Sequence, residues 1–462
     1  MTTLDRRIDA RIGAARRTPY WLDNAVRPAA RPPLDADTSC DLAVVGGGFS
    51  GLWAAVLAKE ADPDRDVLLL EGGRLAWAAS GRNGGFCAAS LTHGYDNGIS
   101  RFGEAAQIEL DRLGMANLDQ IEETVARYRI DCDFERTGEV DVATEAYQLV
   151  DPADVTDAVH LDQQEVRAEL DSPTFLGGVW DKRGVAMLDP AKLAWGLAEV
   201  AERLGVRIVE QTPVRDLHKQ GQHIELRTDH GTVRARRVAL ATNVFPSLLR
   251  RLRLYCVPVY DHVLMTEPLT DEQLAAIGWQ HRQGFGDSGN QFHYYRLTAD
   301  NRILWGGYDA VYHFGRQVKA EYDDRPATFR TLAEHFDTTF PQLAGIGFSH
   351  RWGGAIDTCT RFCAFYGAAY DHRVAYALGY TGLGVGASRF GAQVMLDLLD
   401  GAETERTRTP LVQSRPLPFP PEPLAFLGIE ATRRSLAHAD ENDGRRNLWL
   451  RGLDKVGLGF DS

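Results

Sequence analysis

The first hundred residues alternate short apolar runs with a helical stretch. Residues 41–45 (DLAVV) are largely apolar, and an Ala-rich stretch of helical character follows and extends to Glu60. A second apolar run, residues 67–70, ends immediately before Glu71. Short continuous apolar runs are typical of strands buried on both faces of a parallel sheet. The pattern therefore predicts a strand, a helix and a second strand, the start of an α/β fold.

The rest of the chain predicts further elements of both kinds. Apolar residues at helical spacing predict helices over residues 103–129 (one or two), 160–171, 191–204, 322–340 and 387–399. Alternating or continuous apolar segments predict strands over residues 134–144, 206–210, 213–217, 257–266, 291–297 and 302–307. Two basic amphipathic stretches, residues 424–437 and 445–457, follow a Pro-rich segment. They could bind a membrane surface, but polar faces of mixed sign favour packing on the protein itself or on a second subunit.

Three glycines lie between the first predicted strand and its helix. Gly46, Gly48 and Gly51 are spaced as G-x-G-x-x-G. The first glycine allows a tight turn, the second lets a pyrophosphate approach the backbone, and the third lets helix and strand pack closely. The helix N-terminus offers N–H groups to phosphates, and Glu71 can accept hydrogen bonds from ribose hydroxyls. Together these features predict a dinucleotide-binding site.

The segment after Glu71 indicates which dinucleotide. Gly73-Arg74 and the run ASGRNGG over residues 79–85 resemble the E-x-G-R…A-S-G-R-N-G-G signature of FAD-dependent oxidoreductases of the D-amino-acid oxidase superfamily. The sequence looks most like the branch that contains γ-glutamylputrescine oxidase and the glycine and sarcosine oxidases. Three later segments resemble the family in the expected order: residues 184–190 (GVAMLDP), 238–243 (VALATN) and 379–385 (GYTGLGV).

This resemblance implies a domain organisation. It implies an α/β fold in which a Rossmann-type FAD-binding domain is interleaved with an α+β substrate domain built on a large antiparallel sheet. We assign residues 37–110, 180–250 and 350–405 to the FAD-binding domain, and residues 111–179 and 251–349 to the substrate domain. Residues 1–36 are expected to form an N-terminal arm, and residues 406–462 a C-terminal helical tail.

The resemblance also implies the residues that contact FAD. They come from the two glycine-rich turns, from the segment after Glu71, and from positions beside the flavin. The expected contacts are Gly46, Gly48, Phe49, Ser50, Gly51, Glu71, Gly73, Arg74, Ala79, Ser80, Asn83, Gly84, Gly85, Val214, Thr242, Trp352, Gly382, Leu383, Gly384 and Val385.

Covalent attachment of the flavin is not expected. The histidine that carries the flavin in dimethylglycine dehydrogenases would fall near Ala78. Cys359 and Cys363 lie several residues beyond the position of the sarcosine oxidase cysteine. We therefore expect non-covalent FAD, with both cysteines as core residues.

Residues near the expected substrate site depart from the family. Trp305 falls on the position of an oxygen-activating lysine in sarcosine oxidases, and Asp309 on the position of a histidine. Because the cation that favours oxygen reduction is missing, the sequence argues against a fast oxidase. The electron acceptor is expected to be oxygen or a carrier. We predict Trp305 and Tyr295 as residues that shape the cavity. Asp309 is predicted to orient the substrate nitrogen, or alternatively to cap a strand at the surface.

The clamp that binds a substrate carboxylate in this family is also missing. Its arginine and lysine would fall near Ala88 and on Gly386. Without both donors a bidentate anion site is lost, so a small free amino acid is a poor candidate substrate. Arg389 could compensate, but we expect it to face another element.

Composition narrows the class of protein further. The chain has 51 basic and 64 acidic residues, a net charge of −13, which argues against a nucleic-acid partner. The six cysteines do not form paired C-x-x-C motifs, so no metal site is expected. No secretory h-region or membrane-spanning run is found, and we expect a cytoplasmic enzyme that could form a homodimer.

Three functions fit these observations. The leading hypothesis is oxidation of an amine C–N bond to an imine by hydride transfer to FAD. The second is an amino-acid or hydroxy-acid dehydrogenase that passes electrons to a quinone or another carrier; the missing clamp counts against it. The third is a flavin monooxygenase that uses NAD(P)H, but it should carry a second G-x-G-x-x-G after a strand, and the later glycine turn follows a different pattern.

Overall fold

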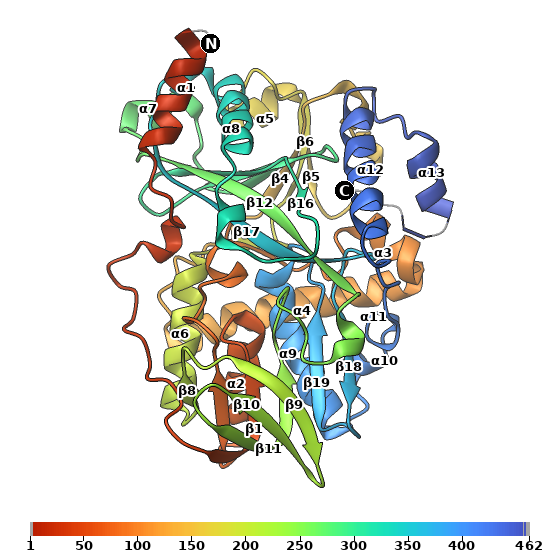
Figure 1. Cartoon of the computed structure of the whole chain (residues 1–462). Coiled ribbons are helices and arrows are strands. Elements are labelled where there is room, and N and C mark those ends of the chain that lie inside the picture. Colours follow the sequence, from red (N-terminus) through yellow and green to blue (C-terminus); the bar gives the residue numbers. More distant parts are fainter. Residues whose placement is uncertain (1–2, 456, 459–462) are drawn as a thin grey trace.

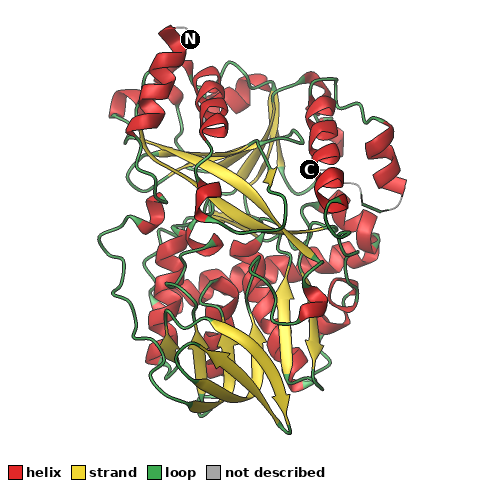
Figure 2. Ribbon diagram, in the orientation of Figure 1, coloured by secondary structure: helices red, strands yellow, loops and turns green. Residues whose placement is uncertain are grey.

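The first of two large sheets is mainly parallel and lies in the lower half of the molecule (Figures 1 and 2). The computed structural model describes residues 3–455, 457 and 458; residues 1, 2, 456 and 459–462 of the expected arm and tail lie outside this range. Within it, strands β18-β19-β11-β1-β2-β8 lie side by side, with β10 and β9 continuing beyond β11. The bounds are β1 (Thr38–Val45), β2 (Val67–Leu70), β8 (Arg207–Val209), β9 (Val214–Gln220), β10 (His223–Thr228), β11 (Thr232–Leu240), β18 (Phe365–Ala369) and β19 (Val374–Leu378).

Both faces of β1 are buried, which explains its continuous apolar sequence. Leu42 and Val44 pack in the core under the helices, whereas Ala43 and Val45 pack in a second core that includes β9–β11. The helical face is covered by α2 (Phe49–Ala61), α4 (Glu104–Tyr128), α6 (Pro190–Arg203) and α9 (Gly384–Asp400). A shorter helix, α3 (Tyr95–Phe102), and a two-stranded sheet of β3 (Phe86–Ala88) and β7 (Val185–Met187) adjoin this core.

The second sheet forms the upper half and is largely antiparallel (Figure 1). Its order is β16-β12-β15-β14-β13-β4-β6-β5, with β17 on the other side of β12. Among the strand pairs of this sheet in the described residues, only β13 and β4 run parallel. The bounds are β4 (Glu139–Ala143), β5 (Val159–Leu161), β6 (Gly177–Asp181), β12 (Cys256–Thr266), β13 (Gly284–Asp287), β14 (His293–Leu297), β15 (Ile303–Gly307), β16 (Val311–Tyr312) and β17 (Phe348–Cys359).

Helices cover the outer face of this sheet. They are α1 (Thr3–Ala14), α5 (Gln163–Glu169), α7 (Asp271–Ile277) and α8 (Pro326–Thr339). Side chains of α8, including Phe329 and Phe336, join the sheet in an aromatic and aliphatic core. The predicted α/β fold, a Rossmann-type sheet with an interleaved antiparallel sheet, is confirmed.

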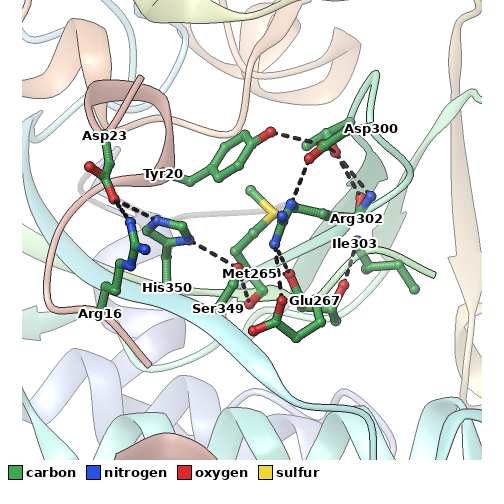
Figure 3. Close-up of polar contacts among 12 residues, drawn as sticks. Arg16, Tyr20, Asp23, Met265, Glu267, Asp300, Arg302, Ile303, Ser349 and His350 are labelled. Atoms are coloured by element: carbon green, nitrogen blue, oxygen red, sulfur yellow. Dashed lines mark hydrogen bonds and ion pairs between the residues drawn. The ribbon is translucent and has the colours of Figure 1, made fainter. Parts of the chain in front are cut away.

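The described part of the N-terminal arm is attached to the second sheet. Helix α1 packs on α8 and β17, and the chain then follows the edge of the sheet toward β1. Figure 3 shows two polar contacts that attach it: Asp23 binds His350 at 3.1 Å, and the Tyr20 hydroxyl donates to Asp300 at 2.8 Å. Within the arm, Asp23 also binds Arg16 at 2.7 Å. The arm therefore connects the helices and edge of the second sheet to strand β1 of the first sheet.

The C-terminal tail packs against the substrate sheet. It contains α10 (Glu405–Arg408), α11 (Pro410–Gln413), α12 (Leu424–Asp440) and α13 (Leu448–Lys455). Asp440 accepts hydrogen bonds from the backbone N–H groups of Asn290 (3.1 Å) and Gln291 (2.9 Å), and the Tyr312 hydroxyl donates to Glu422. Within the described part of the chain, no helix has the length and apolar character needed to cross a bilayer.

Some local predictions were less accurate than the overall fold. One or two helices were predicted over residues 103–129, and the segment does form one long helix, α4 (Glu104–Tyr128). Residues 160–171 were predicted as one helix, but the segment begins as strand β5, and Asp162 caps the short helix α5 by accepting the N–H of Glu165. Pairing of β5 with β6 overrides the local helical pattern at Leu161.

Candidate active site

The first glycine turn brings strand β1 and helix α2 into close contact. Gly46 has a φ of +113°, and a Cβ atom there would collide with the carbonyl oxygen of Ala241. A Cβ atom at Gly51 would collide with the carbonyl oxygen of Gly46. Helix α2 begins at Phe49, so its first N–H groups, which have no acceptor within the helix, lie at this turn. The turn is thus suited to bind a pyrophosphate.

Glu71 lies at the carboxyl end of β2 and holds the backbone around it. Its carboxylate accepts hydrogen bonds from the N–H groups of Gly47 (2.6 Å) and Gly73 (2.6 Å) and from the indole of Trp77 (3.0 Å). Burial raises the pKa of Glu71, and the three donors oppose that shift. Because each carboxylate oxygen can accept two hydrogen bonds, Glu71 can also accept a ribose hydroxyl.

A cavity of about 1600 Å³ extends from this turn to the substrate sheet. Pockets for one small molecule typically measure about 300–1,000 Å³, so this cavity can hold a dinucleotide together with a second molecule. Most of the predicted cofactor contacts line it: Gly46, Gly48, Phe49, Ser50, Glu71, Gly73, Ala79, Ser80, Asn83, Gly84, Val214, Thr242, Gly382, Leu383, Gly384 and Val385.

The second glycine turn lies against the same cavity. The Gly379 N–H donates to the Asp357 carboxylate at 2.6 Å, and burial raises the pKa of Asp357 to about 7. Gly382 has a φ of +95°, and helix α9 begins at Gly384. The N-terminus of α9 therefore contributes partial positive charge to the cavity wall.

Four predicted cofactor residues do not line the cavity. Gly51 packs α2 on its turn, as described above. The Arg74 guanidinium binds Glu210 at 3.2 Å and the carbonyl oxygen of Pro28 at 2.7 Å. Gly85 has a φ of +78° and lies against the backbone of Leu188. The Trp352 indole donates a hydrogen bond to the carbonyl oxygen of Arg82 at 2.9 Å. In this structure these residues position the cofactor site without facing it.

The structure corrects the prediction that Trp305 and Tyr295 shape the cavity. Both are fully buried in the aromatic core between the sheet and α8. Trp305 contacts Phe336 edge-on, with ring centroids 5.7 Å apart, and the Tyr295 hydroxyl donates to Asp287 at 3.2 Å. Successive strand residues face opposite sides of a sheet, so Tyr294, not Tyr295, faces the cavity.

Asp309 was predicted either to orient the substrate nitrogen or to cap a strand at the surface, and it lies just beyond the end of β15. Its carboxylate accepts hydrogen bonds from Thr328 (2.9 Å) and from the guanidinium groups of Arg325 and Arg433, the latter at 3.1 Å. It does not line the cavity. Instead it connects the end of β15 to α8 and to tail helix α12.

Three acidic side chains of the substrate sheet line the cavity: Glu139 on β4, Asp357 on β17 and Asp261 on β12. Sequence reasoning missed Asp261. Its carboxylate accepts hydrogen bonds from the Tyr294 hydroxyl and from the N–H groups of Gly307 (3.1 Å) and His262 (2.7 Å). Both Asp261 and Tyr294 line the cavity. Burial raises the pKa of Asp261 to about 6 and raises that of the Tyr294 phenol further above its ordinary value.

Tyr294 connects this acid to the cofactor side of the cavity. Its ring lies against Gly84, part of the predicted flavin-binding segment, and meets Phe86 edge-on with centroids 5.9 Å apart. A single aspartate within the apolar strand VPVYDHVLM was the available signal in the sequence. The sheet pairing that places it beside Gly307 was not readable from the sequence.

The positions of the family's carboxylate clamp cannot hold cations here. A Cβ atom at Gly386 would collide with the carbonyl oxygen of Ala88, so a side chain does not fit between β3 and α9. Arg389 faces away, as expected: its guanidinium donates to Gln120 at 2.5 Å and lies over the Trp53 ring. The arginines that do line the cavity bind protein groups: Arg82, Arg215, Arg253 and Arg433.

The two cysteines considered for covalent attachment lie in the core. Cys359 and Cys363 are fully buried, and the Cys359 thiol lies 3.2 Å from the carbonyl oxygen of Cys363. Neither lines the cavity. Among the described residues, no cluster of histidine, cysteine or acidic side chains is arranged to hold a metal ion.

Fold and site together define a flavoprotein oxidoreductase. A Rossmann-type sheet with two glycine turns faces one cavity, and the substrate sheet forms its opposite wall. Residues 41–398 match the family described as FAD dependent oxidoreductase. The chain belongs to this family, and its cofactor is FAD.

Individual relatives agree with this assignment. The chain is 30% identical over 398 residues to gamma-glutamylputrescine oxidoreductase of Escherichia coli, which covers 83% of this chain and 88% of the relative. It is 28% identical over 397 residues to the probable oxidoreductase OrdL of Haemophilus influenzae, with coverage of 83% and 88%. Glycine oxidase from Geobacillus kaustophilus shares the fold with a TM-score of 0.65 and 20% identity, over 82% of this chain and 99% of that one.

Proposed function

We propose that this protein oxidises a C–N bond of an amine to an imine, with non-covalently bound FAD as the electron acceptor. The observation that carries the proposal is Asp261, a carboxylate in the cavity wall opposite the glycine turns. Among the described residues it has hydrogen-bond donors but no ion-pair partner within 4 Å. An acidic group in that position attracts an ammonium or accepts a proton from it.

The chemistry of this chain follows from that arrangement. The substrate arrives as an ammonium, and Asp261 accepts its proton, so that the nitrogen lone pair becomes available. Bound FAD supplies the acceptor for the hydride that leaves the α-carbon. The C–H bond breaks with its electron pair, and the nitrogen lone pair forms the C=N bond of an iminium ion. This ion loses a proton to water to give the imine, which water later hydrolyses. Tyr294 keeps the carboxylate oriented toward the cavity throughout.

The missing carboxylate clamp supports an amine over an amino acid. Gly386 has no room for a side chain, and Arg389 is bound to Gln120. The name of the Escherichia coli relative refers to γ-glutamylputrescine, an amine, which agrees with this substrate class. Oxygen or a carrier then removes the electrons from the reduced enzyme.

Anaerobic bleaching of the flavin absorbance tests the proposal. Primary and secondary amines are mixed with the holoenzyme in parallel with small amino acids and hydroxy acids. We expect amines alone to bleach the flavin, and Asp261→Asn to slow bleaching strongly while FAD stays bound. Bleaching by amino or hydroxy acids alone would contradict the proposal and favour a dehydrogenase that uses a carrier.

A further inference from the structure

The C-terminal tail forms part of the cavity wall, which its sequence did not indicate. Residues from the Pro-rich segment and from both tail helices line the cavity together with the glycine turns and the substrate sheet. The family match ends at residue 398, so this wall lies outside the matched region. Its apolar members on the two helices include Leu424, Leu427, Ile429, Leu436, Trp449 and Leu453.

These side chains form an apolar mouth that is open to solvent. Leu424 is 62% exposed and Leu427 is 59% exposed, yet both line the cavity. Exposed apolar side chains that line a concave site favour binding of an apolar group, because binding removes their surface from water. The cavity is thus acidic near Asp261 and apolar near the tail.

The tail wall is held in a defined place. Arg433 on α12 binds Asp309 at 3.1 Å, and Asp440 at the end of α12 binds the backbone of Gln291 at 2.9 Å. Between the two helices, the Trp449 indole donates to the Thr432 hydroxyl at 3.0 Å. These contacts tie the wall to the substrate sheet, so its apolar side chains are presented in a fixed arrangement.

We propose that the tail wall is a binding subsite for the apolar part of the substrate, an aliphatic chain or a ring several carbons from the reacting nitrogen. The inference rests on the proposed function, since the charged nitrogen is placed at Asp261. It narrows the substrate class to amphipathic amines. One continuous cavity extends from Asp261 to α12 and α13, so the nitrogen and the apolar part of one substrate can be bound together.

A series of n-alkylamines from propylamine to octylamine tests the subsite on the holoenzyme. Binding to the oxidised enzyme is measured by calorimetry, and flavin reduction by anaerobic stopped flow, so that affinity and rate are separated. We expect the dissociation constant to fall about two- to fourfold for each added methylene. In the double variant Ile429→Ala/Leu453→Ala this dependence on chain length is expected to weaken.

Leu448→Ala is the matched control. Leu448 lies on α13 like Leu453, but it is 86% exposed and does not line the cavity. It is expected to retain the dependence on chain length seen in the wild-type protein. Equal effects of the control and of the double variant would overturn the subsite.

Other outcomes separate the subsite from the proposed function. Affinity that rises with chain length while the flavin stays oxidised would refute amine oxidation but retain the subsite. Flavin reduction with affinity independent of chain length would refute the subsite and retain amine oxidation. A third outcome is that the double variant keeps its alkylamine affinity but changes in sedimentation or in binding to lipid vesicles. That result would assign the apolar mouth to contact with a second copy or a membrane, and it would overturn the subsite.

Discussion

The Asp309 carboxylate and the Arg433 guanidinium, 3.1 Å apart, connect the end of β15 to helix α12. Their side chains are only 16% and 27% exposed, and Arg325 binds the same carboxylate from the start of α8. Asp309 was predicted either to orient the substrate nitrogen or to cap a strand at the surface; it lies outside the cavity lining and anchors the cavity wall.

Asp309→Asn should destabilise the tail more than it affects the reaction. Removing one charge from a partly buried ion pair leaves two arginines without their full partner, and we expect a loss of about 1–3 kcal/mol in the free energy of unfolding. Hydrogen exchange of residues 424–440 should accelerate. Arg434→Ala is the control, since Arg434 is 78% exposed and its contact with Glu430 is 3.7 Å long. An unchanged exchange rate with a hundredfold slower flavin reduction would instead make Asp309 a substrate contact.

Flavin reduction should lose rate below pH 6 through Asp261. Burial raises the pKa of Asp261 to about 6, so the carboxylate is mostly ionised at pH 7 and mostly protonated below pH 6. The proton acceptor is then lost, and the rate should fall toward tenfold per pH unit. Asp261→Asn should remove this limb of the pH profile and lower the rate about 10²- to 10⁴-fold. The measurement is stopped-flow reduction from pH 5 to 9, and a profile that is the same in both proteins would exclude this role.

Tyr294→Phe should change the pH profile without abolishing the reaction. The Tyr294 hydroxyl donates to Asp261, which stabilises the ionised carboxylate and lowers its pKa. Loss of this donor should move the acidic limb of the pH profile to higher pH while the rate at high pH changes less. Tyr295→Phe is the neighbouring control, because Tyr295 lies in the core on the opposite face of the sheet. Equal shifts in the two variants would indicate an indirect structural effect.

Gly46→Ala should abolish FAD binding. The φ of +113° is unfavourable for any residue with a Cβ atom, and the added carbon would collide with Ala241. We expect the purified variant to contain little flavin and to unfold at a lower temperature. Gly13→Ala is the matched control, since no atom lies within 4 Å of a Cβ there. Full flavin content in Gly46→Ala would show that the turn can rearrange.

Acid should weaken the fold through His262. Burial lowers its pKa to about 4, whereas an imidazole in the unfolded chain titrates near pH 6.5. As pH falls from 6.5 to 4, the unfolded state gains a proton that the folded state does not bind, so stability falls, by up to about 3 kcal/mol for this group. His262→Gln keeps a donor for the Tyr322 carbonyl and should reduce this pH dependence in urea unfolding. His218→Gln, at an exposed imidazole, is the control; an equal change in both variants would exclude His262 as the cause.

Local patterns were sufficient for the elements that hold the cofactor. Residues 67–70 were predicted as a strand and form β2 with the same bounds, and Glu71 follows it at the cavity. The glycine turns were readable because close backbone approach and positive φ admit few residues other than glycine. Strand, turn and helix lie within a few positions of one another along the chain, and the apolar runs, the glycine spacing and the helical period record them directly.

The substrate side depended on contacts between distant segments. Tyr294 and Tyr295 are adjacent tyrosines on the same strand, so residue type does not distinguish them. Only the pairing of β14 with β15 decides which ring faces the cavity. Asp309 binds Arg433 across a separation of 124 residues, and the tail is held at the cavity by this pair together with the contacts of Asp440 with Asn290 and Gln291. The sequence by itself determined the family, the cofactor and the two-sheet fold. The tertiary structure decided which side chains line the cavity, because strand register and helix packing depend on burial across the whole chain.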